Sequence, residues 1–137
     1  MSQMERTLVL IKPDAVRRAL VGQIVARYEA RGLQVVALEL RQIDAAFAAR
    51  HYAEHVGRDY YPGLEAYITS GPLVAMVLAG ERAIDAVRTM NGATDAATAL
   101  AGTIRGDLAT SKRENLVHAS DSPESAAREV ALWFPQV

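Results

Sequence analysis

A single histidine stands at the end of a short apolar stretch in the segment Asn115-Leu116-Val117-His118-Ala119-Ser120-Asp121. The apolar residues predict a brief strand, and the histidine falls where that strand gives way to a loop before the helix start at Ser122-Pro123. At such a position one ring nitrogen is free to meet a ligand, while neighbouring groups hold the other nitrogen and select the tautomer. His118 is therefore a candidate nucleophile, although lone histidines are also common as surface or core residues.

Three cations elsewhere in the chain have side chains suited to phosphate. Lys12 follows an apolar run and precedes Pro13, which keeps Lys12 extended at the strand end. Arg88 falls near the end of a predicted helix, and Arg105 lies in the segment Gly102-Thr103-Ile104-Arg105-Gly106-Asp107. Glycine lets a backbone approach an anion closely, and a guanidinium binds phosphate oxygens in pairs. The plain alternatives are a solvated lysine and an arginine that complements the helix dipole.

Two other motifs compete with this interpretation. The segment His51-Tyr52-Ala53-Glu54-His55 matches the H-x-x-E-H pattern of a zinc peptidase helix, with Glu124 or Glu129 available as a third ligand. The tripeptide Arg105-Gly106-Asp107 matches a cell-adhesion motif, but chance is the better interpretation in a chain without cysteine or a signal-peptide pattern. The sequence contains no G-x-x-x-x-G-K-[ST] or G-x-G-x-x-G motif, so bound phosphate would be held by side chains and by the loop around Arg105.

The candidate residues are distributed over a repeated strand and helix pattern. Apolar runs predict strands at Thr7–Ile11, Val35–Leu40, Leu73–Leu78 and Leu116–His118. Helical spacing is found for Leu20, Ile24 and Tyr28 before a cap at Gly32, for Ala45–Arg50, for Leu64–Thr69, and for Ala83, Ile84, Val87 and Met90. A last helix has Ser122 as N-cap and Pro123 at its first position, with an expected buried stripe of Ala127, Val130, Ala131 and Phe134.

This order predicts an α+β fold, a ferredoxin-like sandwich with a four-stranded antiparallel sheet and helices covering one face. The other face is left for a partner subunit to close. The segment from Asn91 to Glu114 shows no clear period, and a loop of that length inside a small domain predicts a functional role.

The bulk composition limits the possible functions. The chain has 137 residues, a net charge of −1, 50% hydrophobic residues and no cysteine. That length predicts a single domain over residues 1–137 with one core. The near-neutral charge argues against nucleic acid as a partner, and no apolar run reaches the ~18 residues of a membrane span. Thiolate metal sites and disulfides are excluded, and a cytoplasmic location is the expectation.

The sequence resembles nucleoside diphosphate kinases over nearly its whole length. The resemblance is carried by six blocks in this order: Glu5-Arg6-Thr7, Ile11-Lys12-Pro13-Asp14, His51 to His55, Ser70-Gly71-Pro72, Gly102 to Asp107, and Asn115 to His118. It implies a ferredoxin-like subunit in a homo-oligomer, a hexamer in preference to a tetramer. It also implies Mg²⁺-bound ATP, GTP and other nucleoside tri- and diphosphates as substrates, low base selectivity, a phosphohistidine intermediate in a ping-pong exchange, and no protein-held metal.

The resemblance also assigns roles to individual residues. It implies that His118 is the nucleophile and that Glu129 and Ser120 orient it. Phosphates would be held by Lys12, Arg88, Thr94 and Arg105, and sugar hydroxyls by Lys12 and Asn115. Tyr60 would be the platform on which the base stacks. The segment His51 to His55 would be a helix near the site, with Tyr52 and Glu54 supporting it.

Three residues depart from the family pattern. Tyr60 stands where phenylalanine is common, which adds a hydroxyl of unknown partner to the base platform. Ala119 follows the histidine where glycine is usual, and Ala101 replaces a usual proline before Gly102. We expect Ala119 to have ordinary torsion angles and the enzyme to be active. Two alternatives stay open at this point: a catalytically silent family member and a zinc peptidase.

Overall fold

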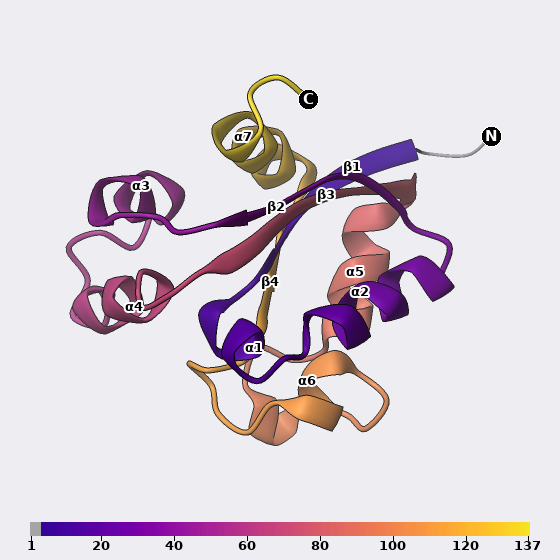
Figure 1. Cartoon of the computed structure of the whole chain (residues 1–137), viewed down its shortest axis with the longest axis horizontal. Helices are drawn as coiled ribbons and strands as arrows, with labels where there is room; N and C mark the ends of the chain where they lie inside the picture. The colour runs from indigo at the N-terminus through magenta and orange to yellow at the C-terminus, as the bar shows by residue number, and fades with distance from the viewer. Residues whose placement is uncertain (1–3) are drawn as a thin grey trace.

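The computed structural model describes residues 4–137, which fold around a four-stranded sheet in the order β2-β3-β1-β4 (Figure 1). Its strands are β1 (Met4–Ile11), β2 (Gln34–Arg41), β3 (Leu73–Glu81) and β4 (Val117–Ala119). Every paired neighbour is antiparallel. The predicted fold class is confirmed, and the predicted strands are present with ends shifted by at most three residues.

The predicted helices are present in the predicted order, with two short helices, α1 and α6, that the sequence did not predict. They are α1 (Pro13–Arg17), α2 (Val21–Ala30), α3 (Ala45–His51), α4 (Tyr61–Ile68), α5 (Ala83–Asn91), α6 (Ile104–Leu108) and α7 (Pro123–Trp133), with a 3₁₀ turn η1 (Ala96–Thr98). Gly32 follows α2 at a φ of 93°, a backbone conformation that glycine adopts without strain. The Ser122 side chain caps α7 by accepting a hydrogen bond from the Ser125 amide, as the sequence predicts.

Alternating residues of the central strands contribute to two separate cores, one on each face of the sheet, where the chain length had predicted one. Val9 and Ile11 of β1 face a core shared with α2 and α5, whereas Leu8 and Leu10 face a core shared with α3, α4 and α7. Burial on both sides explains why β1 and β3 are apolar along their whole central length. The ferredoxin-like helices α2 and α5 cover one face, as predicted, and Figure 1 shows α7 on the opposite side of the sheet.

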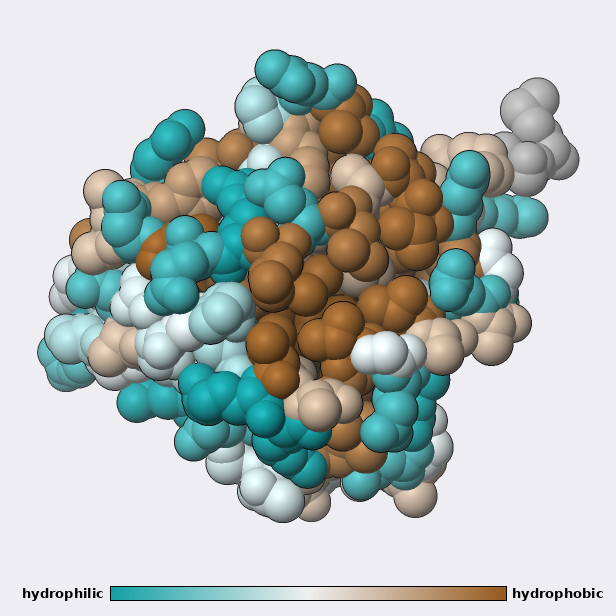
Figure 2. Space-filling model, viewed as in Figure 1, coloured by the Kyte–Doolittle hydropathy of each residue, from teal (hydrophilic) through white to brown (hydrophobic). Residues whose placement is uncertain are grey.

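The second face is therefore not left to a partner subunit along most of its length. The expectation fails because α7 and the α3–α4 pair supply their own apolar side chains to it. Edge strand β2 is the exception, since Val36, Leu38 and Leu40 are exposed. The space-filling view shows an apolar area across the middle of this side of the molecule, where β2 crosses it (Figure 2).

Two details of the sequence prediction are wrong. Val130 and Phe134 of the predicted stripe are buried, but Ala127 and Ala131 are exposed. The rest of the buried side of α7 consists of Ala126, Glu129 and Trp133. The sequence did not predict burial of Glu129, because a carboxylate is rarely buried unless it is paired. The segment from Asn91 to Glu114 is also not irregular throughout: it contains η1 and α6, the latter capped by the Thr103 side chain. Within the described residues, no helix has both the length and the apolar character to span a membrane.

Candidate active site

A cleft of about 770 Å³ opens beside β4 and α7. Its walls come from β4, α7, the start of α1, the end of α5, the connection between α3 and α4, and the segment before β4. Ten of the eleven residues that the resemblance assigned to the site line it: Lys12, Tyr52, Glu54, Tyr60, Arg88, Thr94, Arg105, Asn115, His118 and Glu129. The eleventh, Ser120, is fully buried and reaches the site through Glu129.

The His118 ring is held from one side. Its Nε2 lies 3.0 Å from Oε1 of Glu129, and the Ser120 hydroxyl donates to the same oxygen at 2.8 Å. The Leu8 amide in turn donates to Ser120, which ties this group to β1. Burial opposes ionisation of Glu129, but the hydrogen bonds from His118 and Ser120 and the positive charge of Arg128 outweigh it and lower the pKa of the carboxyl.

An ionised carboxylate accepts hydrogen bonds and donates none, so Nε2 of His118 is the protonated nitrogen of the neutral ring. The unprotonated Nδ1 then carries the lone pair that is available for nucleophilic attack. Because the His118 side chain keeps 22% of its surface exposed on the cleft, a substrate can reach it.

The two residues before His118 form a strained turn. Leu116 has a φ of 75°, and the Val117 amide donates to the Asn115 carbonyl at 2.9 Å, which closes a three-residue turn of the uncommon γ type. A positive φ is strained for leucine, so neighbouring groups must stabilise this conformation of Leu116. The Lys12 amide donates to the Leu116 carbonyl at 2.8 Å, and the Leu116 amide donates to Oδ2 of Asp14 at 3.2 Å.

The register of β1 against β4 brings Lys12 to this turn. Ile11, the last residue of β1, pairs with Val117, so Lys12 follows opposite Leu116, and its side chain reaches Asn115. Nζ of Lys12 donates to Oδ1 of Asn115 at 2.9 Å, and Nδ2 of Asn115 donates to the Thr94 carbonyl at 2.9 Å. Burial, reinforced by the charge of Arg105 and opposed by Asp14, lowers the pKa of Lys12 to about 8.

The two arginines occupy different environments. Arg105, on α6, is 8% exposed and donates to the carbonyls of Asn115 at 3.2 Å, Gly92 at 2.8 Å and Val117 at 2.6 Å. It therefore holds the end of α5 and the strained turn together, with the rest of its N–H groups available to the cleft. Arg88, in the last turn of α5 as predicted, is exposed and makes one longer contact to the Ala119 carbonyl, at 3.4 Å.

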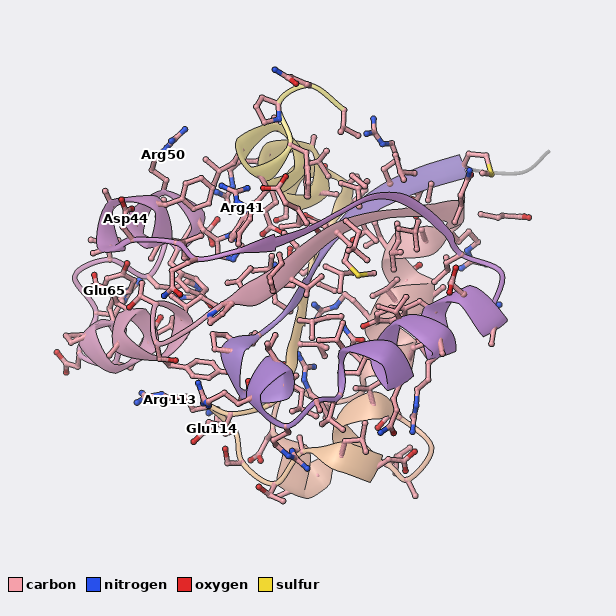
Figure 3. All side chains as sticks on the ribbon, viewed as in Figure 1. Arg41, Asp44, Arg50, Glu65, Arg113 and Glu114 are labelled. Atoms are coloured by element: carbon pink, nitrogen blue, oxygen red, sulfur yellow. The ribbon has the colours of Figure 1, made fainter. Side chains whose placement is uncertain are left out.

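The other end of the cleft is more open. Tyr60 is 48% exposed and stands at the start of α4 with Leu64 one turn further on. Lys112 and Arg113 approach from the segment before β4. Figure 3 shows Arg113 reaching toward α4, where its guanidinium lies so close to Gly63 that a side chain there would meet it. This end offers an aromatic ring, an apolar side chain and two cations.

The comparisons with known proteins agree with this geometry. The family described as nucleoside diphosphate kinase matches residues 5–137. The chain belongs to the nucleoside diphosphate kinase family. A nucleoside diphosphate kinase from Cutibacterium acnes is 67% identical over 137 residues, which cover 100% of this chain and 99% of that protein.

Solved structures are similar over the same length. A nucleoside diphosphate kinase from Halobacterium salinarum, in complex with CDP, is 46% identical with a TM-score of 0.94, over 96% of this chain and 88% of that one. The enzyme from Aquifex aeolicus is 40% identical with a TM-score of 0.94, over 96% of both chains. As a member of this kinase family, the protein is a transferase of nucleotide metabolism.

The structure also gives specific partners to two residues that the sequence analysis named without assigning them a role at the phosphate site. Asp14 holds the strained turn and accepts a hydrogen bond from the Tyr67 hydroxyl, while being only 3% exposed. His51 is 3% exposed, and its Nδ1 accepts a hydrogen bond from Nε1 of Trp133 at 3.0 Å. Both residues lie in sequence blocks that carry the family resemblance, which is the only sequence signal for them. Their roles become clear only from their hydrogen-bond partners, which are distant in the sequence.

The zinc peptidase alternative fails on the geometry of the same block. Helix α3 ends at His51, and residues 52–60 form turns, so His51 and His55 do not lie one turn apart on a helix. The expectation of a helix from His51 to His55 is wrong for the same reason. In addition, the described residues include no group of three or more histidine, aspartate and glutamate side chains arranged to hold a metal ion.

Proposed function

We propose that the protein moves the γ-phosphate of a nucleoside triphosphate to a nucleoside diphosphate through a phosphohistidine on His118. The observation that carries this proposal is the arrangement in the cleft: Nε2 of His118 is held by Glu129, so that Nδ1 is the ring nitrogen left for attack on a substrate. Lys12, Arg88 and Arg105 line the same cleft and supply positive charge for the transferred group. Ser120 supports the ring through Glu129.

The two half-reactions balance on this one residue. In the first, the Nδ1 lone pair forms a bond to the γ-phosphorus, and the bond to the bridging oxygen breaks, so that the diphosphate leaves with the electron pair. In the second, a terminal phosphate oxygen of another diphosphate attacks the phosphorus, and the N–P bond returns its electrons to His118. A phosphate oxygen is already deprotonated, so no separate base is needed.

The remaining roles belong to the same proposal. Lys12, Arg88, Thr94 and Arg105 would hold phosphates, and Lys12 with Asn115 would meet the sugar hydroxyls. Tyr60 would stack on the base, with Tyr52 behind it in the wall. Stacking uses the face of a base and reads none of its edges, which supports low base selectivity. Mg²⁺ enters as part of the substrate, because its ligands are then phosphate oxygens and water.

Assembly and location complete the proposal. The exposed Val36, Leu38 and Leu40 on edge strand β2 support a homo-oligomer, since apolar side chains grouped on a sheet edge favour association. We propose a hexamer in preference to a tetramer, built from one domain per chain, 1–137, and checked by sedimentation. A cytoplasmic location fits substrates that are intracellular metabolites.

Labelling tests the mechanism directly. Protein incubated with γ-labelled ATP and Mg²⁺ is expected to take up label that is labile in acid and stable in base, and to release it when GDP is added. His118→Ala, checked for folding by circular dichroism, is expected to take up none. Normal labelling and transfer by His118→Ala would rule out the proposed intermediate, and an unlabelled wild-type protein would favour the catalytically silent alternative.

A further inference from the structure

The hydroxyl of Tyr60 has a partner that the sequence did not reveal. It lies 2.6 Å from Nδ1 of His55, five residues earlier in the chain. The two rings also touch edge to face, with centroids 5.6 Å apart and planes inclined by 64°. Both side chains line the cleft at its open end. Tyr60 is thus fixed at its hydroxyl tip, although nearly half of its surface is exposed.

His55 is itself part of a continuous series of rings. From His118 the centroids step 4.8 Å to His51, 4.6 Å to Tyr52, 5.8 Å to His55 and 5.6 Å to Tyr60, each contact edge to face. We name these five rings the aromatic ladder. Edge-to-face contacts at such distances are attractive and depend on orientation, so each ring restrains the next.

The inner part of the aromatic ladder is buried, and the outer part is exposed at Tyr60. His51 and Tyr52 are buried, and Trp133 holds His51 through its Nδ1. Burial, followed by the charge of His118, lowers the pKa of His51 well below its usual value, so that ring stays neutral between its neighbours. Tyr60 has no such burial. His55 is the ring that connects the exposed platform to the fixed wall.

We propose that His55 is a positioning residue for the base of the bound nucleotide, acting by locking the Tyr60 ring through its hydroxyl. The proposal rests on the proposed function, in which Tyr60 stacks on the base. A ring that already stands in its bound orientation saves the cost of ordering it when the nucleotide enters. Because a tyrosine hydroxyl donates and accepts, the contact forms with either tautomer of His55.

The lock predicts an effect of a particular kind. It acts on the orientation of the platform and makes no contact with the edges of the base, so affinity should change equally for adenine, guanine, cytosine and uracil nucleotides. The transferred phosphate is handled at the other end of the cleft, so the turnover number at saturation should stay the same. A phenylalanine at position 60 stacks as well as tyrosine but has no hydroxyl to hold.

A double-mutant cycle tests the inference. Binding of ADP, GDP, CDP and UDP is measured by calorimetry for wild type, Tyr60→Phe, His55→Leu and the double variant, together with kcat and KM. Each single change is expected to raise Kd by about two- to tenfold, the range of one net hydrogen bond. The double variant should be no worse than either single one, since both remove the same contact. The kcat value should stay within about twofold.

Tyr61→Phe is the matched control. It removes the buried hydroxyl of the neighbouring tyrosine, which forms no hydrogen bond with His55 among the described residues, and it should leave Kd unchanged. Unchanged Kd values in both single variants, additive losses, or a loss confined to one base would each overturn the inference. Calorimetry measures binding without turnover, so its result is independent of the labelling experiment. Failure to form phosphohistidine would refute the proposed mechanism, whereas Kd values that do not change across the four proteins would refute the positioning role of His55.

Discussion

The two ends of the cleft are built in different ways. At the phosphate end, His118, Asn115 and Arg105 each contact groups that are themselves buried or hydrogen-bonded. At the base end, Tyr60 is 48% exposed and is held by a single hydrogen bond to His55. Transfer of a phosphoryl group depends on exact placement of donors, whereas stacking tolerates any base. Buried hydrogen bonds are therefore concentrated at the phosphate end, where the reacting groups must be placed accurately.

The largest expected effects are those of replacing the two arginines of the phosphate end, which should differ in their effect on stability. Arg105→Ala and Arg88→Ala should each lose about 2 kcal/mol or more of transition-state stabilisation, measured as kcat/KM. Arg105→Ala should also lose about 1–3 kcal/mol of unfolding free energy, because three carbonyls lose their donor. Arg88 is exposed, so its removal should change stability by less than about 0.5 kcal/mol.

Urea denaturation of the two variants decides between these outcomes. Equal stability of Arg105→Ala and Arg88→Ala would show that the buried contacts of Arg105 are not structural. Arg105→Lys should recover only part of the lost activity, since lysine has no planar fork. Kinetics close to wild type in both alanine variants would remove the two arginines from the site.

At the base end, Tyr60→Ala should weaken nucleotide binding by about 1–3 kcal/mol, the usual contribution of one stacked base. The loss should be the same for all four bases and should appear in KM with little change in kcat. Kinetics with four diphosphate acceptors measures it. A hundredfold preference for one base, before or after the substitution, would mean that side chains read the base edge and that the two ends are more alike than we infer.

The lowered pKa of Lys12 makes the phosphate end sensitive to pH. In the free enzyme this lysine loses its proton near pH 8, so affinity for ADP should fall by about tenfold between pH 7 and pH 10, as one charge-assisted hydrogen bond is lost. Stability should move in the opposite direction. The unfolded chain keeps the proton up to its usual pKa near 10.5, so it binds more protons than the folded protein between pH 8 and pH 10.5, and stability rises with pH there.

Calorimetry and urea denaturation across that pH range, with Lys12→Met beside wild type, check both trends. Lys12→Met should abolish them, and Lys112→Met, which removes a lysine from the base end, should keep them. A wild-type profile that matches Lys12→Met would show that Lys12 does not titrate in this range.

The smallest expected effect concerns Ala119, next to the nucleophile. It lies in β4, and only Ala19, Arg82 and Leu116 have a positive φ among the non-glycine residues that the structure describes. Ordinary torsion angles at Ala119 confirm the sequence expectation. Ala119→Gly should therefore lower the free energy of unfolding by a few tenths to ~1 kcal/mol, because glycine has more freedom in the unfolded chain. A glycine variant that is both more stable and faster would contradict this reasoning.

Much of the fold could be predicted because its signals are local. The apolar runs of β1 and β3, the cap at Ser122 and the glycine after α2 each depend on a few adjacent residues. The resemblance added the candidate site residues, and ten of them line one cleft. The stripe of α7 was misjudged because a buried glutamate looks like a surface residue until its partner is known.

The sequence by itself determined which residues were able to do chemistry: a lone histidine after an apolar step, cations near glycines, and an aromatic residue for stacking. Only the tertiary structure decided how they act. The register of Ile11 against Val117 places Lys12 beside Asn115, 103 residues away. The positive φ of Leu116 and the contact between Tyr60 and His55 likewise depend on groups brought together by folding. Such contacts are set by packing, and packing is a property of the whole sheet and its helices, which no local pattern records.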